Sequence, residues 1–105
     1  MNILLCCAAG MSTSLIVSKM EKVAESKGIS ARIWAVSESV VRSEIDEADV
    51  LLLGPQVRFL LEEMEEICEE KNIPVEVINM MNYGTCDGEA ILEQAINLIK
   101  ISSNC

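Results

Sequence analysis

Residues 3–14, ILLCCAAGMSTS, pass from an apolar run through two cysteines and a small loop to three hydroxyl side chains. The run Ile3 to Cys6 shows no polar alternation, which is typical of a strand buried on both faces of a parallel sheet. From Ser12 to about Lys27 apolar residues recur at helical spacing, and Gly28 follows the last of them. The stretch therefore predicts a strand, a short loop and a helix in succession.

Cys7 stands where this strand ends and the helix is about to begin. The free N–H groups and the dipole at a helix N-terminus favour negative charge, so they stabilise a thiolate or a phosphoryl group. Gly10 can adopt the backbone angles that an anion cradle requires. Cys7 is thus the candidate nucleophile, and the candidate phosphate-binding residues follow it directly: Ala8, Ala9, Gly10, Met11, Ser12, Thr13 and Ser14.

Each of these residues also has a purely structural interpretation. A lone cysteine is most often a small core residue, and a hydroxyl residue before a helix is often its cap. Strand alternation turns Cys6 away from Cys7, so we expect Cys6 to lie in the core. Cys68 falls on the apolar stripe of a helical pattern and is expected there too.

The remaining chain alternates between strand and helix patterns. The expected strands are 29–36, 49–53 and 74–78, and the expected helices are 38–45, a third with an apolar face from Val57 to Cys68, and a last one with Ile91 to Ile99 on its buried side. Right-handed crossovers turn this order into a four-stranded parallel sheet, 2-1-3-4, in a three-layer αβα architecture. Its ligand edge would bring together the loop after Cys7, the turn at Gly54 and a loop from Asn79 to about Asp87.

Composition limits the classes of function. The 105 residues predict one domain spanning 1–105, and a net charge of −9 argues against nucleic acid and anionic membranes as partners. Five cysteines, no histidine and no paired Cys-x-x-Cys motif argue against a disulfide framework or a metal site and indicate a reducing cytoplasm. No apolar run approaches the ~18–20 residues needed to cross a bilayer.

The loop from Cys7 to Ser14 contains no arginine or lysine. A cysteine phosphatase needs a cation to clamp the transferring group and an acid for the leaving group. A phosphoryl group on Cys7 would be held by neutral donors alone, which favours passing it to a partner. A small cysteine phosphatase and a non-catalytic interaction domain are the alternative interpretations.

Three segments, Cys7 to Ser14, Leu52 to Gln56 and Tyr83 to Gly88, together resemble a known family. They are similar to the signature segments of enzyme IIB of the bacterial sugar phosphotransferase system, of the lactose/cellobiose (N,N'-diacetylchitobiose) type. The resemblance covers the whole chain in order. The loop departs from the commonest family form in having Ala8 where serine is frequent.

The resemblance implies a fold related to that of the low-molecular-weight tyrosine phosphatases and a phosphocarrier cycle. Cys7 would accept a phosphoryl group from a phosphohistidine of the IIA protein and pass it to a sugar, a β-disaccharide such as cellobiose, chitobiose or lactose, held by the membrane permease IIC. Gln56, Tyr83 and Asp87 would lie beside the site or contact a partner. No cofactor is implied, and we expect a cytoplasmic monomer.

Overall fold

The computed structural model describes residues 1–8 and 11–103, without the side chains of 11–13 and 103. Expectations that rest on Ala9, Gly10 and the side chains of Met11, Ser12 and Thr13 lie outside the described residues. The strands are β1 (Asn2–Cys7), β2 (Arg32–Ser37), β3 (Val50–Leu53) and β4 (Val75–Val77). The α-helices are α1 (Met11–Ser26), α2 (Val41–Glu44), α3 (Leu61–Glu69), α4 (Met80–Gly84) and α5 (Gly88–Ser103), and the 3₁₀ segments are η1 (Ile45–Glu47) and η2 (Pro55–Leu60).

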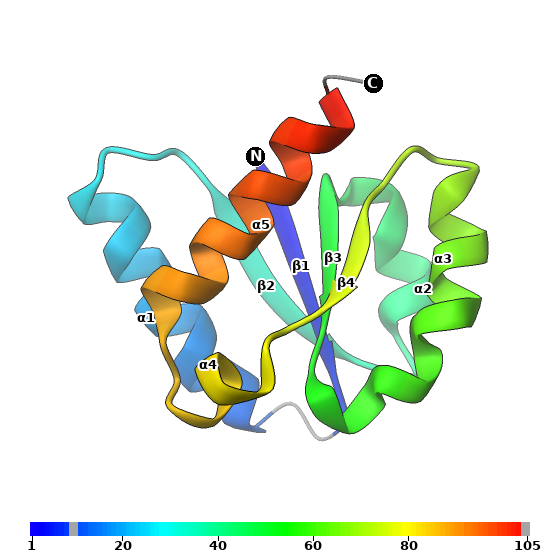
Figure 1. Ribbon diagram of the computed structural model, residues 1–105, viewed down its shortest axis with the longest axis horizontal. Coiled ribbons are helices and arrows are strands. Elements are labelled where there is room, and N and C mark those ends of the chain that lie inside the picture. The colour runs from blue at the N-terminus through cyan, green and yellow to red at the C-terminus, as the bar shows by residue number, and fades with distance from the viewer. Residues whose placement is uncertain (9–10, 104–105) are drawn as a thin grey trace.

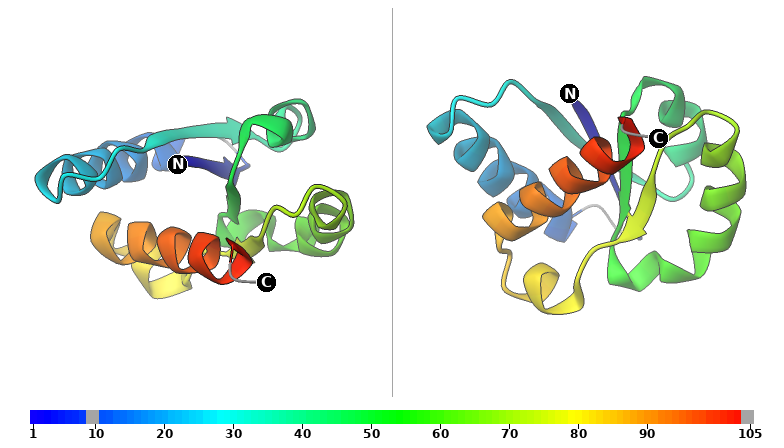
Figure 2. Two further views of the ribbon diagram at one scale, coloured as in Figure 1. Left: turned by 90° about the horizontal axis from the view of Figure 1, so that it is seen from above. Right: turned by 45° about the horizontal axis from the view of Figure 1, so that its top comes forward.

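The four strands form one parallel sheet in the order β2-β1-β3-β4. Helices α1 and α5 cover one face of this sheet, while α2 and α3 cover the other (Figures 1 and 2). The predicted three-layer αβα architecture and strand order are confirmed. Strand β1 lies between two neighbours, which explains why its sequence lacks polar alternation.

Two separate cores pack against the two faces of the sheet. Alternate residues of β1 divide between them, because successive side chains of a strand point to opposite faces. Ile3 and Leu5 join the core under α1 and α5, whereas Leu4 and Cys6 join the core under α2 and α3. Cys6 and Cys68 are fully buried in the second core, as the sequence predicts.

The structure corrects the expected loop between Asn79 and Asp87. Its first half is the short helix α4, whose N-cap is Asn79. The side-chain Oδ1 of Asn79 accepts hydrogen bonds from the backbone N–H groups of Met81 and Asn82, at 3.0 and 3.1 Å. Capping of this kind stabilises the first turn of a helix. Helix α4 has only five residues, so its sequence shows no apolar periodicity that would predict it.

The segment after β3 also differs in detail from the sequence pattern. The apolar spacing predicts one helix from Val57 onward, but residues 55–60 form the 3₁₀ segment η2 and α3 begins at Leu61. Val57 has φ −114° and ψ 23°, which breaks the helical path. Pro55 follows Gly54 at the start of η2, so the chain turns sharply at the end of β3.

The contact between α1 and α5 depends on a glycine, and two glycines offer a matched test. A Cβ at Gly88 would lie 2.8 Å from the backbone carbonyl carbon of Lys19, whereas a Cβ at Gly84 would meet nothing within 4 Å. We expect Gly88→Ala to lower the free energy of unfolding by about 1–3 kcal/mol, because backbone must move. Gly84→Ala should leave it unchanged or raise it by up to about 1 kcal/mol. Urea unfolding of both variants checks this, and equal stabilities would contradict it.

Candidate functional site

Cys7 is the last residue of the central strand β1, at the edge of the sheet where all four parallel strands end. Cys7 is buried, with 2% of its surface exposed. Helix α1 begins at Met11, so its N-terminus lies at the same edge as Cys7 (Figure 1). Ligands of open parallel sheets bind at this edge, where the crossovers diverge. The predicted nucleophile therefore stands where the fold places ligands.

Gly54, directly after β3, brings the next loop against the cysteine. Its N–H donates to the carbonyl oxygen of Cys6 at 2.8 Å. A Cβ built on Gly54 would lie 3.5 Å from Cys7 Cβ and 2.9 Å from Gln56 Oε1. The side chain of Gln56 thus occupies the space beside Cys7 that a larger residue at position 54 would fill.

Gln56 is linked across the edge to Tyr83, a residue of α4. The Gln56 side-chain amide Nε2 donates a hydrogen bond to the Tyr83 hydroxyl at 3.1 Å. Tyr83 is 8% exposed and belongs to the core under α1 and α5, so the hydroxyl comes from a fixed ring. Two of the three residues predicted beside the site, Gln56 and Tyr83, therefore meet each other next to Cys7.

Asp87 has a structural role at the start of α5. Its Oδ1 accepts a hydrogen bond from the backbone N–H of Ala90 at 3.0 Å, which makes it the cap of that helix. It also lines an open hollow of about 490 Å³ between α1 and α5, together with Lys19 and Lys22. Gln56 and Tyr83 are not among the residues that line this hollow, and no hydrogen bond joins the Asp87 side chain to either of them among those described.

Two hydroxyls near Cys7 were not among the predicted site residues. Ser37, the last residue of β2, is the register partner of Cys7 in the parallel ladder. The Ser37 and Ser39 hydroxyl oxygens are 2.9 Å apart and share a hydrogen bond. The signal in the sequence was a serine at the end of the strand that neighbours β1.

The two fully buried cysteines, Cys6 and Cys68, have raised thiol pKa values. Burial raises the pKa of the Cys6 thiol to about 11, with smaller contributions from Cys7 and Glu38. Burial likewise raises the pKa of Cys68 to about 11, against a lowering effect of Lys71. Both therefore remain neutral thiols near pH 7, as core residues do.

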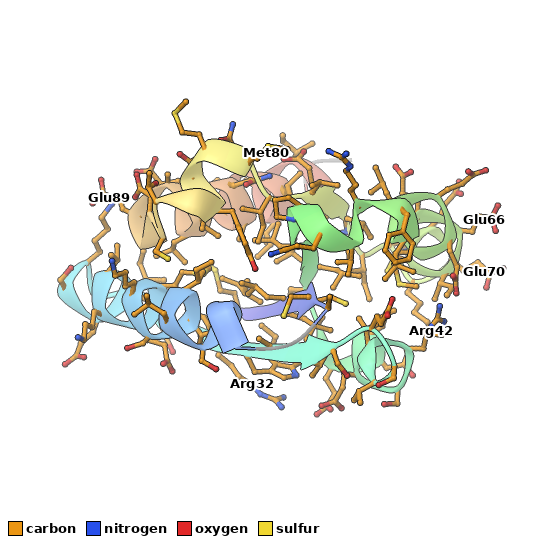
Figure 3. All side chains as sticks on the ribbon, turned by 90° about the horizontal axis from the view of Figure 1, so that it is seen from below. Arg32, Arg42, Glu66, Glu70, Met80 and Glu89 are labelled. Carbon is orange, nitrogen blue, oxygen red and sulfur yellow. The ribbon has the colours of Figure 1, made fainter. Side chains whose placement is uncertain are left out.

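Exposed apolar side chains gather around the edge where Cys7 lies. Each segment that follows a strand at this edge carries at least one: Leu15 of α1, Val40 before α2, Phe59 of η2, and Met80 and Met81 of α4. Figure 3 views this edge from below, with Met80 on α4 pointing outward. We call these five residues the apolar rim. Phe59 is 69% exposed and Met81 76% exposed, which is unusual for side chains of this size without a partner.

Across residues 1–8 and 11–103, no three His, Cys, Asp or Glu side chains come close enough together to hold a metal ion. Nor does any helix within those ranges have the length and apolar content to cross a bilayer.

Comparisons with known proteins show the family of this chain. Residues 2–94 match the family described as "PTS system, Lactose/Cellobiose specific IIB subunit". The chain belongs to this family. An oligo-β-mannoside-specific EIIB component of Bacillus subtilis is 47% identical to this IIB chain over 98 residues, covering 93% of this chain and 95% of the relative. A cellobiose-specific EIIB component of Lactococcus lactis is 43% identical over 102 residues, covering 92% and 94%.

Solved structures agree with this assignment. A cellobiose-specific IIB component from Borrelia burgdorferi matches the IIB chain with a TM-score of 0.81 and 49% identity, covering 97% of this chain and 94% of the other. A lactose-specific IIB domain from Streptococcus pneumoniae has a TM-score of 0.83 at 18% identity and shares the fold. The family resemblance inferred from the sequence is therefore confirmed. Proteins named EIIB components are phosphotransferases.

The raised pKa of Cys68 predicts a pH dependence of stability. A neutral thiol is favoured in the folded state, so its contribution is complete below pH 9.0 and is lost as pH rises to about 11. In Cys68→Ala, the fall in the free energy of unfolding over this range should be smaller than in the unsubstituted chain by about 2–3 kcal/mol. Urea unfolding in reducing buffer measures both slopes.

Met64→Leu is the control for this experiment. Met64 is buried in the same core one helical turn away and carries no titratable group. Met64→Leu should retain the original pH slope. An unchanged slope in Cys68→Ala would contradict the prediction.

Proposed function

We propose that this chain is a phosphocarrier whose Cys7 accepts a phosphoryl group from a phosphohistidine of a IIA protein. It then passes the group to a sugar held by the membrane component IIC. The observation that supports this best is the position of Cys7, in a IIB-family chain, at the carboxyl end of the central strand. We expect backbone N–H groups after Cys7, including those of the first turn of α1, to hold the phosphoryl oxygens.

The chemistry consists of two exchanges at sulfur. In the first, the Cys7 thiolate attacks phosphorus, the S–P bond forms and the N–P bond of the phosphohistidine breaks, while the departing imidazole takes up a proton. In the second, a sugar hydroxyl attacks phosphorus, the S–P bond breaks, and the hydroxyl proton is released as the thiolate returns. Both steps develop charge on the phosphoryl oxygens, which fixed N–H dipoles stabilise.

Neutral surroundings favour such a carrier over a phosphatase on the same fold. Residues 7–14 include no arginine or lysine, so nothing in the loop itself clamps a phosphate ester and its leaving group. Hydrolysis of an aryl phosphate distinguishes the two functions. The carrier should give no turnover above that of Cys7→Ser, whereas a phosphatase would lose its activity in that variant.

The sugar is proposed to be a β-linked disaccharide or short oligosaccharide. This rests on the relatives, whose names specify oligo-β-mannoside, cellobiose and, in another Lactococcus lactis protein, galactose. We further propose that the chain acts in the cytoplasm as a monomer, without entering the membrane. Its excess of negative charge favours soluble partners over anionic lipid surfaces.

The apolar rim is the proposed docking surface for the IIA protein. Transfer requires the phosphohistidine to approach Cys7 closely, so the donor must cover the edge on which the rim lies. The rim residues come from α1, the turn before α2, η2 and α4, and therefore surround Cys7 on several sides. Clustered Met and Phe side chains are typical of the centre of a protein interface.

The carrier assignment predicts one phosphorylated residue. With phosphoenolpyruvate, the general phosphotransferase proteins and a lactose/cellobiose-type IIA protein, intact mass should show one added phosphoryl group, and peptide mapping should place it on Cys7. Cys7→Ser should show none, while Cys68→Ser should still be modified. An adduct that persists in Cys7→Ser would overturn the assignment.

The docking assignment predicts an effect confined to one end of the molecule. Met81→Asp places a charge in the apolar rim and should raise the KM for phosphorylated IIA about tenfold, which corresponds to about 1.4 kcal/mol. Ile101→Asp is the matched control, because Ile101 is 64% exposed near the end of α5, away from the rim. Equal effects of the two substitutions on KM would argue against docking at the rim.

A further inference from the structure

Gln56 and Tyr83 form a hydrogen-bonded pair beside Cys7. The two phosphoryl exchanges at sulfur, as proposed above, involve neither residue. The pair joins η2 to α4 across 27 residues of sequence. Its Gln56 end fills the space above Gly54, next to Cys7 Cβ. An amide in this position is the nearest uncharged polar side chain that η2 offers to a group on the sulfur.

We propose that Gln56 donates a hydrogen bond from Nε2 to the phosphoryl group while that group is on Cys7, and that Tyr83 is the positioning residue for this amide. This rests on the proposed phosphocarrier function. Among the described residues, Nε2 makes one hydrogen bond, to the Tyr83 hydroxyl. An amide nitrogen is a donor with two hydrogens, so Nε2 can donate to a phosphoryl oxygen once it faces the sulfur.

The amide of Gln56 is not yet turned to donate. Gln56 Oε1, an acceptor, is the atom that borders the side of Gly54 where a Cβ would lie. An anionic phosphoryl group on Cys7 would repel the lone pairs of this oxygen. The amide must therefore turn over, bringing Nε2 toward the phosphoryl group when it arrives.

Tyr83 can hold the amide in both orientations. A phenol hydroxyl both accepts and donates, so it can accept from Nε2 before the turn and donate to Oε1 after it. The ring is buried in the core under α1 and α5 and does not need to move. The pair thus supplies a neutral donor where the loop after Cys7 has no basic side chain.

The first test removes the donor at Gln56. Gln56→Met keeps a neutral, unbranched side chain without donors, and Gln56→Glu puts an anion in its place. At saturating phosphorylated IIA, Gln56→Met should slow phosphorylation of Cys7 about 10–100-fold and Gln56→Glu about 100-fold or more, with KM for IIA nearly unchanged. The ³¹P chemical shift of the phosphocysteine should also move in both variants.

The second test moves the amide without changing it. In Gly54→Ala the new Cβ would come 2.9 Å from Gln56 Oε1, a flexible side-chain end, and so displace it. Tyr83→Phe removes the hydroxyl and keeps the buried ring. Each should slow phosphorylation about fivefold in the original chain and have no effect in the Gln56→Met background, because both act through Gln56. Unfolding in urea confirms that each variant is folded.

The outcomes separate three failures. If the unsubstituted chain is phosphorylated on Cys7 and Gln56→Met matches it in both rate and ³¹P shift, the assignment of Gln56 is overturned and the carrier function stands. If Gly54→Ala or Tyr83→Phe slows the reaction equally with and without Gln56, the positioning role is overturned. If the unsubstituted chain takes no phosphoryl group on Cys7, the proposed function fails, and this inference with it.

Discussion

The rest of the structure depends on strand β1 being held between two neighbours. Its backbone is paired with β2 on one side and β3 on the other, and Ile3 to Cys6 are fully buried. A strand fixed in this way cannot shift by one residue, since that would exchange its two buried faces. Cys7, the last residue of β1, therefore lies at one defined point of the sheet edge. The loop after β3 and helix α4 are positioned relative to this point.

Close approach at Gly54 follows from that constraint. The loop after β3 is tied to β1 by the hydrogen bond from Gly54 N–H to Cys6, and the lack of a side chain leaves room for Gln56 beside Cys7. The described polar groups in this neighbourhood are the Gln56 amide and the Tyr83 hydroxyl. In the proposed carrier cycle, a site made of amide and hydroxyl dipoles would stabilise a phosphoryl group moderately, which suits an intermediate that must be released to the next acceptor.

Helix α4 serves two surfaces at once. Tyr83 is buried in the core and accepts a hydrogen bond from Gln56, while Met80 and Met81 are exposed on the apolar rim. Asn79 caps the N-terminus of this short helix. At its other end, the Thr85 hydroxyl donates a hydrogen bond to the carbonyl oxygen of Met81 at 3.0 Å. The apolar rim and the polar contacts near Cys7 are thus connected through the five residues of α4.

The sequence by itself determined the strand order, the three layers, the family and the burial of Cys6 and Cys68, because apolar periodicity records which faces are covered. It also placed Cys7 at the end of a strand. Only the tertiary structure decided that Gln56 meets Tyr83, that Ser37 lies opposite Cys7, and that Asp87 caps α5. These contacts depend on the register of the strands, on the five-residue helix α4, whose sequence shows no apolar periodicity, and on the space left beside Gly54. Such contacts join segments far apart in the chain, and local pattern carries no record of them.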